Sequence, residues 1–417
     1  MVIRTRKRAY KTELRLNNAQ RTLCFKHAFA AIFGYNWGLA RRIELYREKG
    51  ETVNAISLHR ELNKLKKTIY PWLYAVSKCA PQEALRDLDK AFANFFAGRA
   101  GFPRFKSRKR TKMSFRLTGT IRIWDDRIQL PNLKRIRLKE RGYLPTDAHV
   151  LSATISERAG RWYVSVLVNE EYEVPENTGD KEGGDLGVSS LITLSDGSKI
   201  PNPRALRRHL RKIKRLQRAV SRKQKGSNNR RKAVERLKRA HFKVSNIRSD
   251  SIHKATSQLA RTKSVVVLED LNVSGMMKNH RLAQAIGDTG LREFRRQMEY
   301  KCGWYGSEVI FAPRFYPSSK RCSACGHVKA DLSLSARIYR CDICGFVCDR
   351  DQNAAINLKA LLYDPLAIAL AGSSSESLNA WLSREVQITT PDGLDRCSSM
   401  MQESNTKDAT KGMSNFG

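Results

Sequence analysis

Acidic residues are scarce in this chain. Among its 417 residues, 40 Asp and Glu stand against 78 Lys and Arg, and the formal net charge is +38. A charge of this size repels itself strongly unless a polyanion neutralises it. The balance therefore predicts a nucleic-acid partner. It disfavours the alternative of a highly soluble basic protein that binds no phosphate backbone.

Long apolar runs are missing as well. No stretch of eighteen apolar residues, the length that a membrane-spanning helix needs, occurs in the chain. The basic N-terminal segment, residues 1–16, also lacks the apolar stretch of a secretory signal peptide. We therefore expect a soluble cytoplasmic protein with no membrane partner.

The nine cysteines lack the pattern of a secreted disulfide framework. Four of them have the spacing of a metal site. Four others are scattered along the chain: Cys24, Cys79, Cys302 and Cys397. This usage fits a reducing compartment.

Two C-x-x-C pairs predict a zinc site. Two turns of this spacing can present four thiolates to one tetrahedral Zn2+. The expected ligands are Cys322, Cys325, Cys341 and Cys344. The segment continues through Cys348 to Asp349 and Asp351, and NAAINLKALL follows with high helix propensity. One aspartate can cap this helix, which leaves the other for a different task.

The length of the chain allows at least two hydrophobic cores. Strand-like alternation at the N-terminus gives way to helical spacing in three segments, and strand patterns return between residues 114 and 175. We interpret the strands as a small β-barrel, formed by residues 1–17 and 113–177. A helical bundle, residues 18–112, would then be an insertion into this barrel.

The loop of residues 97–112 breaks the helical pattern and interleaves aromatic with basic residues. Such a mixture suits phosphate contact combined with base stacking. The candidate contacts are Phe102, Arg104, Phe105 and Lys106. A solvated linker has a similar composition, and the sequence alone favours neither interpretation.

Residues 204–248 are strongly basic, with 19 Lys and Arg and a single acid, Glu235. Apolar residues at helical intervals predict two helices around a hinge at residues 226–229. Like charges repel along a helix, so we expect contact with a nucleic-acid backbone and binding that weakens steeply with salt. The candidate contacts are Arg207, Arg211, Lys214, Arg215, Arg218, Arg222 and Lys223.

Three acidic positions mark the C-terminal half. Asp185 lies in a Gly-containing bend between two strands, an opening found in ribonuclease-H-like folds and also in ordinary hairpins. Glu269 comes at the end of a β-branched run with the profile of a buried central strand, although an exposed strand end would look similar. Asp351 lies at a helix start. Three converging carboxylates would require divalent cations between them, and hard oxygen ligands suit Mg2+ or Mn2+.

The order of these motifs resembles a known family. The motifs are GDLG at 184–187, LEDLN at 268–272, YPSSKRCSACG at 316–326, CDICG at 341–345 and DRDQNAAINL at 349–358. In this order they resemble the transposon-encoded TnpB (OrfB) family of RNA-guided DNA endonucleases, which is related to type V CRISPR effectors. The resemblance extends from the N-terminal strand through residues 101–105 to about residue 360.

The resemblance implies a multidomain α+β fold. The barrel corresponds to the wedge-like domain of the family, and the helical bundle corresponds to its recognition domain. A ribonuclease-H-like (RuvC-like) α/β nuclease domain would comprise residues 178–314 and 349–365, with a zinc-ribbon insertion at residues 315–348. The C-terminal tail, residues 366–417, has few large apolar residues, and we expect it to be disordered.

The resemblance also implies an activity. The catalytic carboxylates, which would bind Mg2+ or Mn2+, map onto Asp185, Glu269 and Asp351, with Asp349 as the second choice for the third position. The four cysteines would hold a structural zinc. A guide RNA derived from the transposon end would direct cleavage of double-stranded target DNA beside a short target-adjacent motif. The protein would be prokaryotic and associated with the nucleoid when bound to DNA.

Two departures from the family pattern bear on this expectation. Gly184 replaces the usual aliphatic residue before Asp185, which would loosen the strand. Cys348 is an additional thiol that could compete for zinc or be oxidised. Two alternative functions stay open: an RNA-guided repressor that does not cut, and a DNA transposase that needs no guide.

Overall fold

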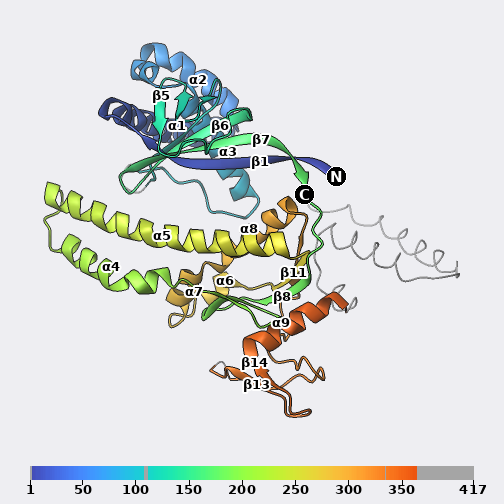
Figure 1. The fold of residues 1–417 in the computed structure, drawn as a ribbon. Helices are drawn as coiled ribbons and strands as arrows, with labels where there is room; N and C mark the ends of the chain where they lie inside the picture. The colour runs from blue at the N-terminus through green and yellow to red at the C-terminus, as the bar shows by residue number, and fades with distance from the viewer. Residues whose placement is uncertain (1, 108–110, 334, 364–417) are drawn as a thin grey trace, which may run out of the picture.

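The computed structural model describes residues 2–107, 111–333 and 335–363, which form a smaller N-terminal part and a larger C-terminal part (Figure 1). Among these residues, no helix combines the length and the apolar character that crossing a membrane requires. Cys397 and the predicted tail lie outside the described residues.

The N-terminal part contains a seven-stranded antiparallel sheet in the order β2-β6-β7-β1-β5-β4-β3. Its strands are β1 (Val2–Arg15), β2 (Ser114–Leu117), β3 (Arg122–Ile123), β4 (Arg127–Leu130), β5 (Lys134–Leu138), β6 (His149–Arg158) and β7 (Arg161–Val174). Within the described part of the chain, no ladder joins the edge strands β2 and β3. The expected barrel is therefore an open sheet in the described residues.

Three helices and a 3-10 turn are inserted between β1 and β2, as the sequence predicts. They are α1 (Asn18–Lys49), α2 (Ala55–Thr68), η1 (Pro71–Ala75) and α3 (Cys79–Phe96). Asn17 ends the strand and begins α1, because its side chain accepts from the Gln20 N–H while the Gln20 side chain accepts from the Asn17 N–H. Buried residues of α1 and α3 share one hydrophobic core with the sheet, so the insertion stabilises the sheet.

The C-terminal part is built on a mixed five-stranded sheet in the order β10-β9-β8-β11-β12. Its strands are β8 (Lys181–Asp185), β9 (Ser190–Leu194), β10 (Lys199–Pro201), β11 (Val265–Glu269) and β12 (Glu308–Ala312). β8, β11 and β12 are parallel, whereas β9 and β10 are antiparallel additions. β11 is buried between two neighbours, as its β-branched sequence predicts.

Helices cover both faces of this sheet (Figure 1). They are α4 (Ala205–Ser221), α5 (Asn228–Thr262), α6 (Val273–Met276), α7 (Ala283–Thr289), α8 (Leu291–Trp304) and α9 (Arg350–Ala360), followed by η2 (Leu361–Tyr363). Val266 and Leu268 pack in the same core as residues of α5 and α8. Val265 and Val267 pack in another core with Leu358 of α9. The alternation of side chains along β11 thus separates the two helical layers.

Two glycines of β8 allow close packing. A Cβ on Gly183 would lie within 2.5 Å of the Lys359 backbone nitrogen, so α9 can rest on β8 only because this residue is glycine. Gly184 lies in register with Leu194 and Leu268, and the Ile192 and Leu268 side chains fill the space beside it. The strand is therefore continuous and packed at Gly184.

The predicted pair of basic helices is present as α4 and α5. They are connected by residues 222–227, so the hinge begins earlier than predicted and Asn228 and Asn229 belong to α5. Ile213 of α4 packs against Ala240 and Val244 of α5. Helix α5 runs between the N-terminal part and the mixed sheet (Figure 1), and its Phe242 ring lies 5.8 Å from the Tyr163 ring of β7. The hairpin thus lies where the two parts of the molecule meet.

Candidate functional site

The two central strands bring Asp185 and Glu269 to the same edge of the sheet. β8 and β11 are parallel neighbours with Gly184 paired to Leu268, and each of these residues precedes one of the two acids. The carboxyl ends of parallel strands meet at one edge. Because α9 packs on Gly183 of β8, the start of this helix delivers Asp351 to the same place.

The three acids interact electrostatically at this edge. Burial, followed by the charges of Glu269 and Asp351, raises the pKa of Asp185 well above its usual value. Burial also raises the pKa of Glu269, and Asp351 adds to that increase. A hydrogen bond from Ser318 and the nearby Arg350 guanidinium oppose the increase at Glu269. The protein therefore gathers negative charge that its own cations only partly neutralise.

Asp349 and Asp351 differ in their contacts. The Asp349 carboxylate caps α9 by accepting from the Asp351 and Gln352 N–H groups at 2.9 and 3.2 Å. It also forms a 2.8 Å ion pair with Lys199 of β10. Although burial opposes the change, these contacts lower the pKa of Asp349. No described residue donates a hydrogen bond to the Asp351 carboxylate, so Asp351 is the better placed of the two to bind an external cation.

Glu269 and Asp270 also differ in their contacts. Asp270 forms ion pairs with Arg295 and, at 2.9 Å, with Arg314. Glu269 instead accepts a hydrogen bond from the Ser318 hydroxyl and interacts electrostatically with the other two acids. Asp270 is therefore a structural residue, and Glu269 belongs to the acidic site.

A cleft of about 300 Å³ opens beside Glu269. Its lining combines Glu269 and Asp270 with residues 312–314 and 316–320, Leu332 and Arg350. The lining also contains three cationic side chains, Arg314, Lys320 and Arg350, of which Arg314 is paired with Asp270.

The donor chemistry of the acids fits a hard divalent cation. Carboxylate oxygens are the ligands preferred by Mg2+ and Mn2+, and Asp185, Glu269 and Asp351 supply them from three separate elements. Among the described residues, a group of ligand atoms all within 4.8 Å of one another is formed only by four cysteines. The carboxylate oxygens are thus more widely spaced than the thiol sulfurs.

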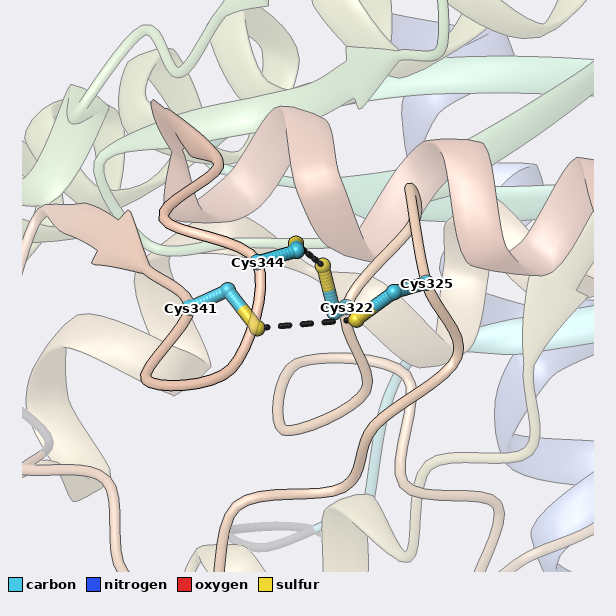
Figure 2. A group of neighbouring side chains, drawn as sticks. All are labelled: Cys322, Cys325, Cys341 and Cys344. Atoms are coloured by element: carbon cyan, nitrogen blue, oxygen red, sulfur yellow. Dashed lines mark hydrogen bonds between the residues drawn. The ribbon is translucent and has the colours of Figure 1, made fainter.

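The four predicted zinc ligands converge at the tips of two loops (Figure 2). The Cys322 and Cys344 sulfurs are 3.7 Å apart, and those of Cys325 and Cys341 are 3.6 Å apart. Tetrahedral coordination with Zn–S bonds of about 2.3 Å requires sulfurs roughly 3.8 Å apart, so the spacing fits zinc. Backbone N–H groups of Cys344 and Ile343 lower the pKa of the Cys341 thiol to about 6, which favours the thiolate that zinc needs.

Cys348 is not part of this group. It lies on β14 (Val347–Asp349), which pairs with β13 (Ile338–Arg340), and its thiol contacts the Gln352 side chain at 3.7 Å. Burial and the adjacent Asp349 raise the pKa of Cys348, which disfavours the thiolate. The predicted competition for zinc therefore has no support in the structure.

Two asparagines of α9 join the zinc ribbon to the acidic site. Asn353 accepts from the Ser323 N–H at 3.0 Å and donates to the Arg321 carbonyl at 2.7 Å. Asn357 donates to the Ser318 and Arg321 carbonyls at 2.8 and 2.7 Å. Both are almost completely buried. They were not predicted from the sequence, although two asparagines one helical turn apart in an apolar helix are a signal for buried polar contacts.

The loop candidates for nucleic-acid contact have different environments. Arg104 and Phe105 are exposed. Phe102 is partly covered, with its ring edge-on to Phe92 and Phe95. The Lys106 ammonium lies 3.7 Å from the centre of the Tyr35 ring, and burial lowers its pKa. Lys106 therefore packs within the N-terminal part, in contrast to Arg104 and Phe105.

The seven candidates on the basic hairpin share one property: all lie at least partly open to solvent. They are Arg207, Arg211, Lys214, Arg215, Arg218, Arg222 and Lys223. The apolar side of α4 packs on α5, so its cationic side faces solvent. None of the seven forms an ion pair with an acidic residue in the described part of the chain.

Comparisons with known proteins agree with the motifs. Residues 163–280 match the OrfB family model described as "Probable transposase", residues 292–358 match "Cas12f1-like, TNB domain", and residues 1–51 match a family model described as "Helix-turn-helix domain". The last segment consists here of strand β1 followed by the single long helix α1. Together the matches extend over both parts of the molecule.

Relatives and a solved structure extend this likeness to most of the chain. A "Putative RNA-guided DNA endonuclease" of Streptomyces pristinaespiralis is 40% identical over 330 residues, which cover 78% of this chain and 82% of that protein. The relative InsQ of Escherichia coli K12, with the same description, is 32% identical and covers 92% of this chain and 99% of its own. A cryo-EM structure of a Cas12f1-sgRNA-target DNA complex has a similar fold, with a TM-score of 0.51 at 12% identity, over 86% of this chain and 99% of that one. The chain belongs to the OrfB (TnpB) family.

Proposed function

We propose that this chain is a transposon-encoded, RNA-guided DNA endonuclease that depends on Mg2+ or Mn2+. The observation that carries the proposal is geometric: Asp185 and Glu269 end two neighbouring parallel strands, and Asp351 lies in the first turn of the helix that packs on β8. Membership in a family whose relatives are named as RNA-guided DNA endonucleases supports the same activity.

The two parts of the molecule would have different functions. The sheet of residues 1–17 and 113–177 corresponds to the wedge-like domain, and residues 18–112 correspond to the recognition domain. Together they would hold a guide RNA from the transposon end and read a short motif beside the target. The order of the five-stranded sheet supports a RuvC-like nuclease domain formed by residues 178–314 and 349–365.

The residues of the acidic edge have separate tasks in this proposal. Asp185, Glu269 and Asp351 hold the catalytic cations. When bound there, Mg2+ or Mn2+ would supply the charge that activates water and stabilises the transition state of phosphodiester hydrolysis. Ser318 orients Glu269 through its hydroxyl. Asp349 keeps the first turn of α9 in place through its cap and its ion pair with Lys199.

The zinc ribbon, residues 315–348, has a supporting task. Four thiolates leave no open coordination position on a tetrahedral zinc, so this metal stabilises the fold rather than activating water. Through Asn353 and Asn357 the ribbon is joined to the helix that carries Asp351.

An Asp351→Ala variant tests this assignment. We expect it to lose Mg2+-dependent cleavage, by roughly 100-fold or more, while it retains guided binding to target DNA. Asp349→Ala is the matched control: it removes a helix cap that contributes about 1 kcal/mol, so it should lower thermal stability and retain measurable cleavage. Unchanged cleavage by Asp351→Ala would contradict the assignment.

A further inference from the structure

We propose that Phe315 is a stacking platform for an unpaired base of the DNA strand that is being cut. This inference rests on the proposed nuclease function and adds a substrate contact to it. The contact lies outside the three carboxylates, on the loop whose residues Arg314 and Tyr316 line the cleft beside Glu269.

Phe315 is unusually exposed. Its side chain is 92% accessible to solvent, which is the highest value for any large hydrophobic residue in the described part of the chain. Its ring makes no aromatic or cation contact with another described residue. A phenyl ring left in water forfeits hydrophobic stabilisation, and an exposed ring becomes informative where cationic groups and an acidic site lie on the same loop.

The backbone around Phe315 is fixed. The Tyr316 N–H donates to the Pro313 carbonyl at 2.9 Å and closes a tight turn with Phe315 near its tip. Arg314, on one side, is held by its ion pair with Asp270, and the Tyr316 hydroxyl, on the other side, donates to the Asn357 carbonyl at 3.2 Å. With both neighbours anchored to the protein, the Phe315 ring is presented to solvent on a rigid support.

This support belongs to the acidic site. Arg314 and Tyr316, the neighbours of Phe315 in sequence, both line the cleft beside Glu269. Ser318, in the same loop, donates to Glu269. Phe315 is thus flanked by the cleft lining on both sides, and the loop that carries it directly contacts a proposed catalytic residue.

The side chains near Phe315 indicate which kind of ligand it would bind. Arg314, Lys320 and Arg350 line the cleft and match a phosphate backbone. An exposed aromatic ring beside cationic groups is the usual arrangement for binding single-stranded nucleic acid, in which stacking contributes roughly 1–3 kcal/mol per base. Bases in a duplex are already stacked on their neighbours, so the ring is suited to an unpaired base. An apolar protein segment is the competing ligand.

The test uses the full-length complex with its guide RNA and a bound target, and it measures single-turnover cleavage. Phe315→Ala should slow cleavage roughly 5- to 150-fold, which corresponds to the stacking range, without changing guided binding. Phe315→Trp should retain the rate of the wild type. Phe315→Leu keeps apolar surface and removes the aromatic ring, so it should cleave as slowly as Phe315→Ala.

An abasic site, moved along each strand of the target DNA in turn, identifies the base. At one position it should slow the wild type by the same factor as Phe315→Ala, and it should slow Phe315→Ala no further. Tyr46→Ala removes another exposed aromatic ring, 65% accessible and located on α1, and it should show no such coupling. Full activity of Phe315→Leu, or additive effects at every abasic position, would overturn the proposal.

A wild-type complex that binds its target and does not cut would overturn the nuclease function instead. In that case the fluorescence of 2-aminopurine, placed at the same strand positions, still reports on stacking against Phe315. Quenching that occurs in the wild type and is absent in Phe315→Ala supports stacking. Equal fluorescence in both proteins contradicts it.

Discussion

At the scale of single residues, adjacent acids with similar sequence context have different roles. Glu269 belongs to the acidic site and Asp270 is paired with two arginines. Asp351 lies near the other acids and Asp349 caps the helix. In the sequence, the cap argument leaves one of Asp349 and Asp351 free without selecting either, and the choice of Asp351 follows from the family resemblance. The sequence does not reveal Lys199 as the partner of Asp349, because that contact joins residues far apart in the chain.

Asn357 provides a prediction at this scale. Asn357→Ala leaves the buried Ser318 carbonyl without its side-chain donor, which costs about 1–3 kcal/mol, whereas the Arg321 carbonyl keeps the hydrogen bond from Asn353. Because Ser318 also donates to Glu269, we expect a lower melting temperature together with slower cleavage and normal guide binding. Asn18→Ala, at an exposed position of α1, is the control and should change stability by less than about 0.5 kcal/mol. Wild-type melting and cleavage of Asn357→Ala would refute this positioning role.

At the scale of secondary structure, the site depends on how α9 lies on β8. Periodicity predicts the long helices, the central strand and the helix after Asp351, because each repeats its apolar residues over several turns or alternates them. The short helices α6 and α7 were not predicted, since segments this short carry too little periodic signal. The contact of α9 with β8 was not predicted either, because it depends on one glycine and on the tertiary arrangement.

Gly183 tests that contact. A Cβ at this position would collide with backbone atoms of α9, which cannot move away as a flexible side chain can. Gly183→Ala should therefore displace the helix that carries Asp351, destabilise the protein by about 1–3 kcal/mol and reduce cleavage severely. Gly303→Ala on α8, where a Cβ would meet no atom within 4 Å, should be neutral or slightly stabilising. If Gly183→Ala cuts and melts like the wild type, the packing of α9 on β8 is not what holds Asp351.

At the scale of the whole molecule, the positive charge is concentrated where a polyanion can reach it. The net charge of +38 predicts nucleic acid, and the cationic side of α4 faces away from α5, the helix that lies between the two parts of the protein (Figure 1). The prediction that the N-terminal sheet closes into a barrel was wrong. Among the described residues, no hydrogen-bonded ladder joins its two edge strands. Alternating side chains predict strands, whereas closure depends on how short edge strands meet, which the pattern does not encode.

The salt dependence of binding tests the role of α4. Replacing both Arg211 and Arg215 with Gln should weaken guide-RNA binding and lower the magnitude of the log-log salt slope by roughly 0.7–0.9 for each phosphate that the variant no longer neutralises. Lys254→Gln is a matched control on α5, because Lys254 is exposed but already paired with Asp250 at 2.8 Å. A salt slope of the double variant equal to that of the wild type would show that α4 does not contact the backbone.

The central claim is that an RNA bound by this protein selects the DNA that its carboxylates cut. The most direct measurement is cleavage of double-stranded DNA by the purified protein before and after ribonuclease treatment, followed by addition of a guide with a new targeting sequence. The account predicts a discrete co-purified RNA, loss of cleavage on its removal, and restored Mg2+-dependent cleavage only at the new matching target. RNA-free protein that cuts the same DNA equally well would contradict the account and favour a guide-independent transposase.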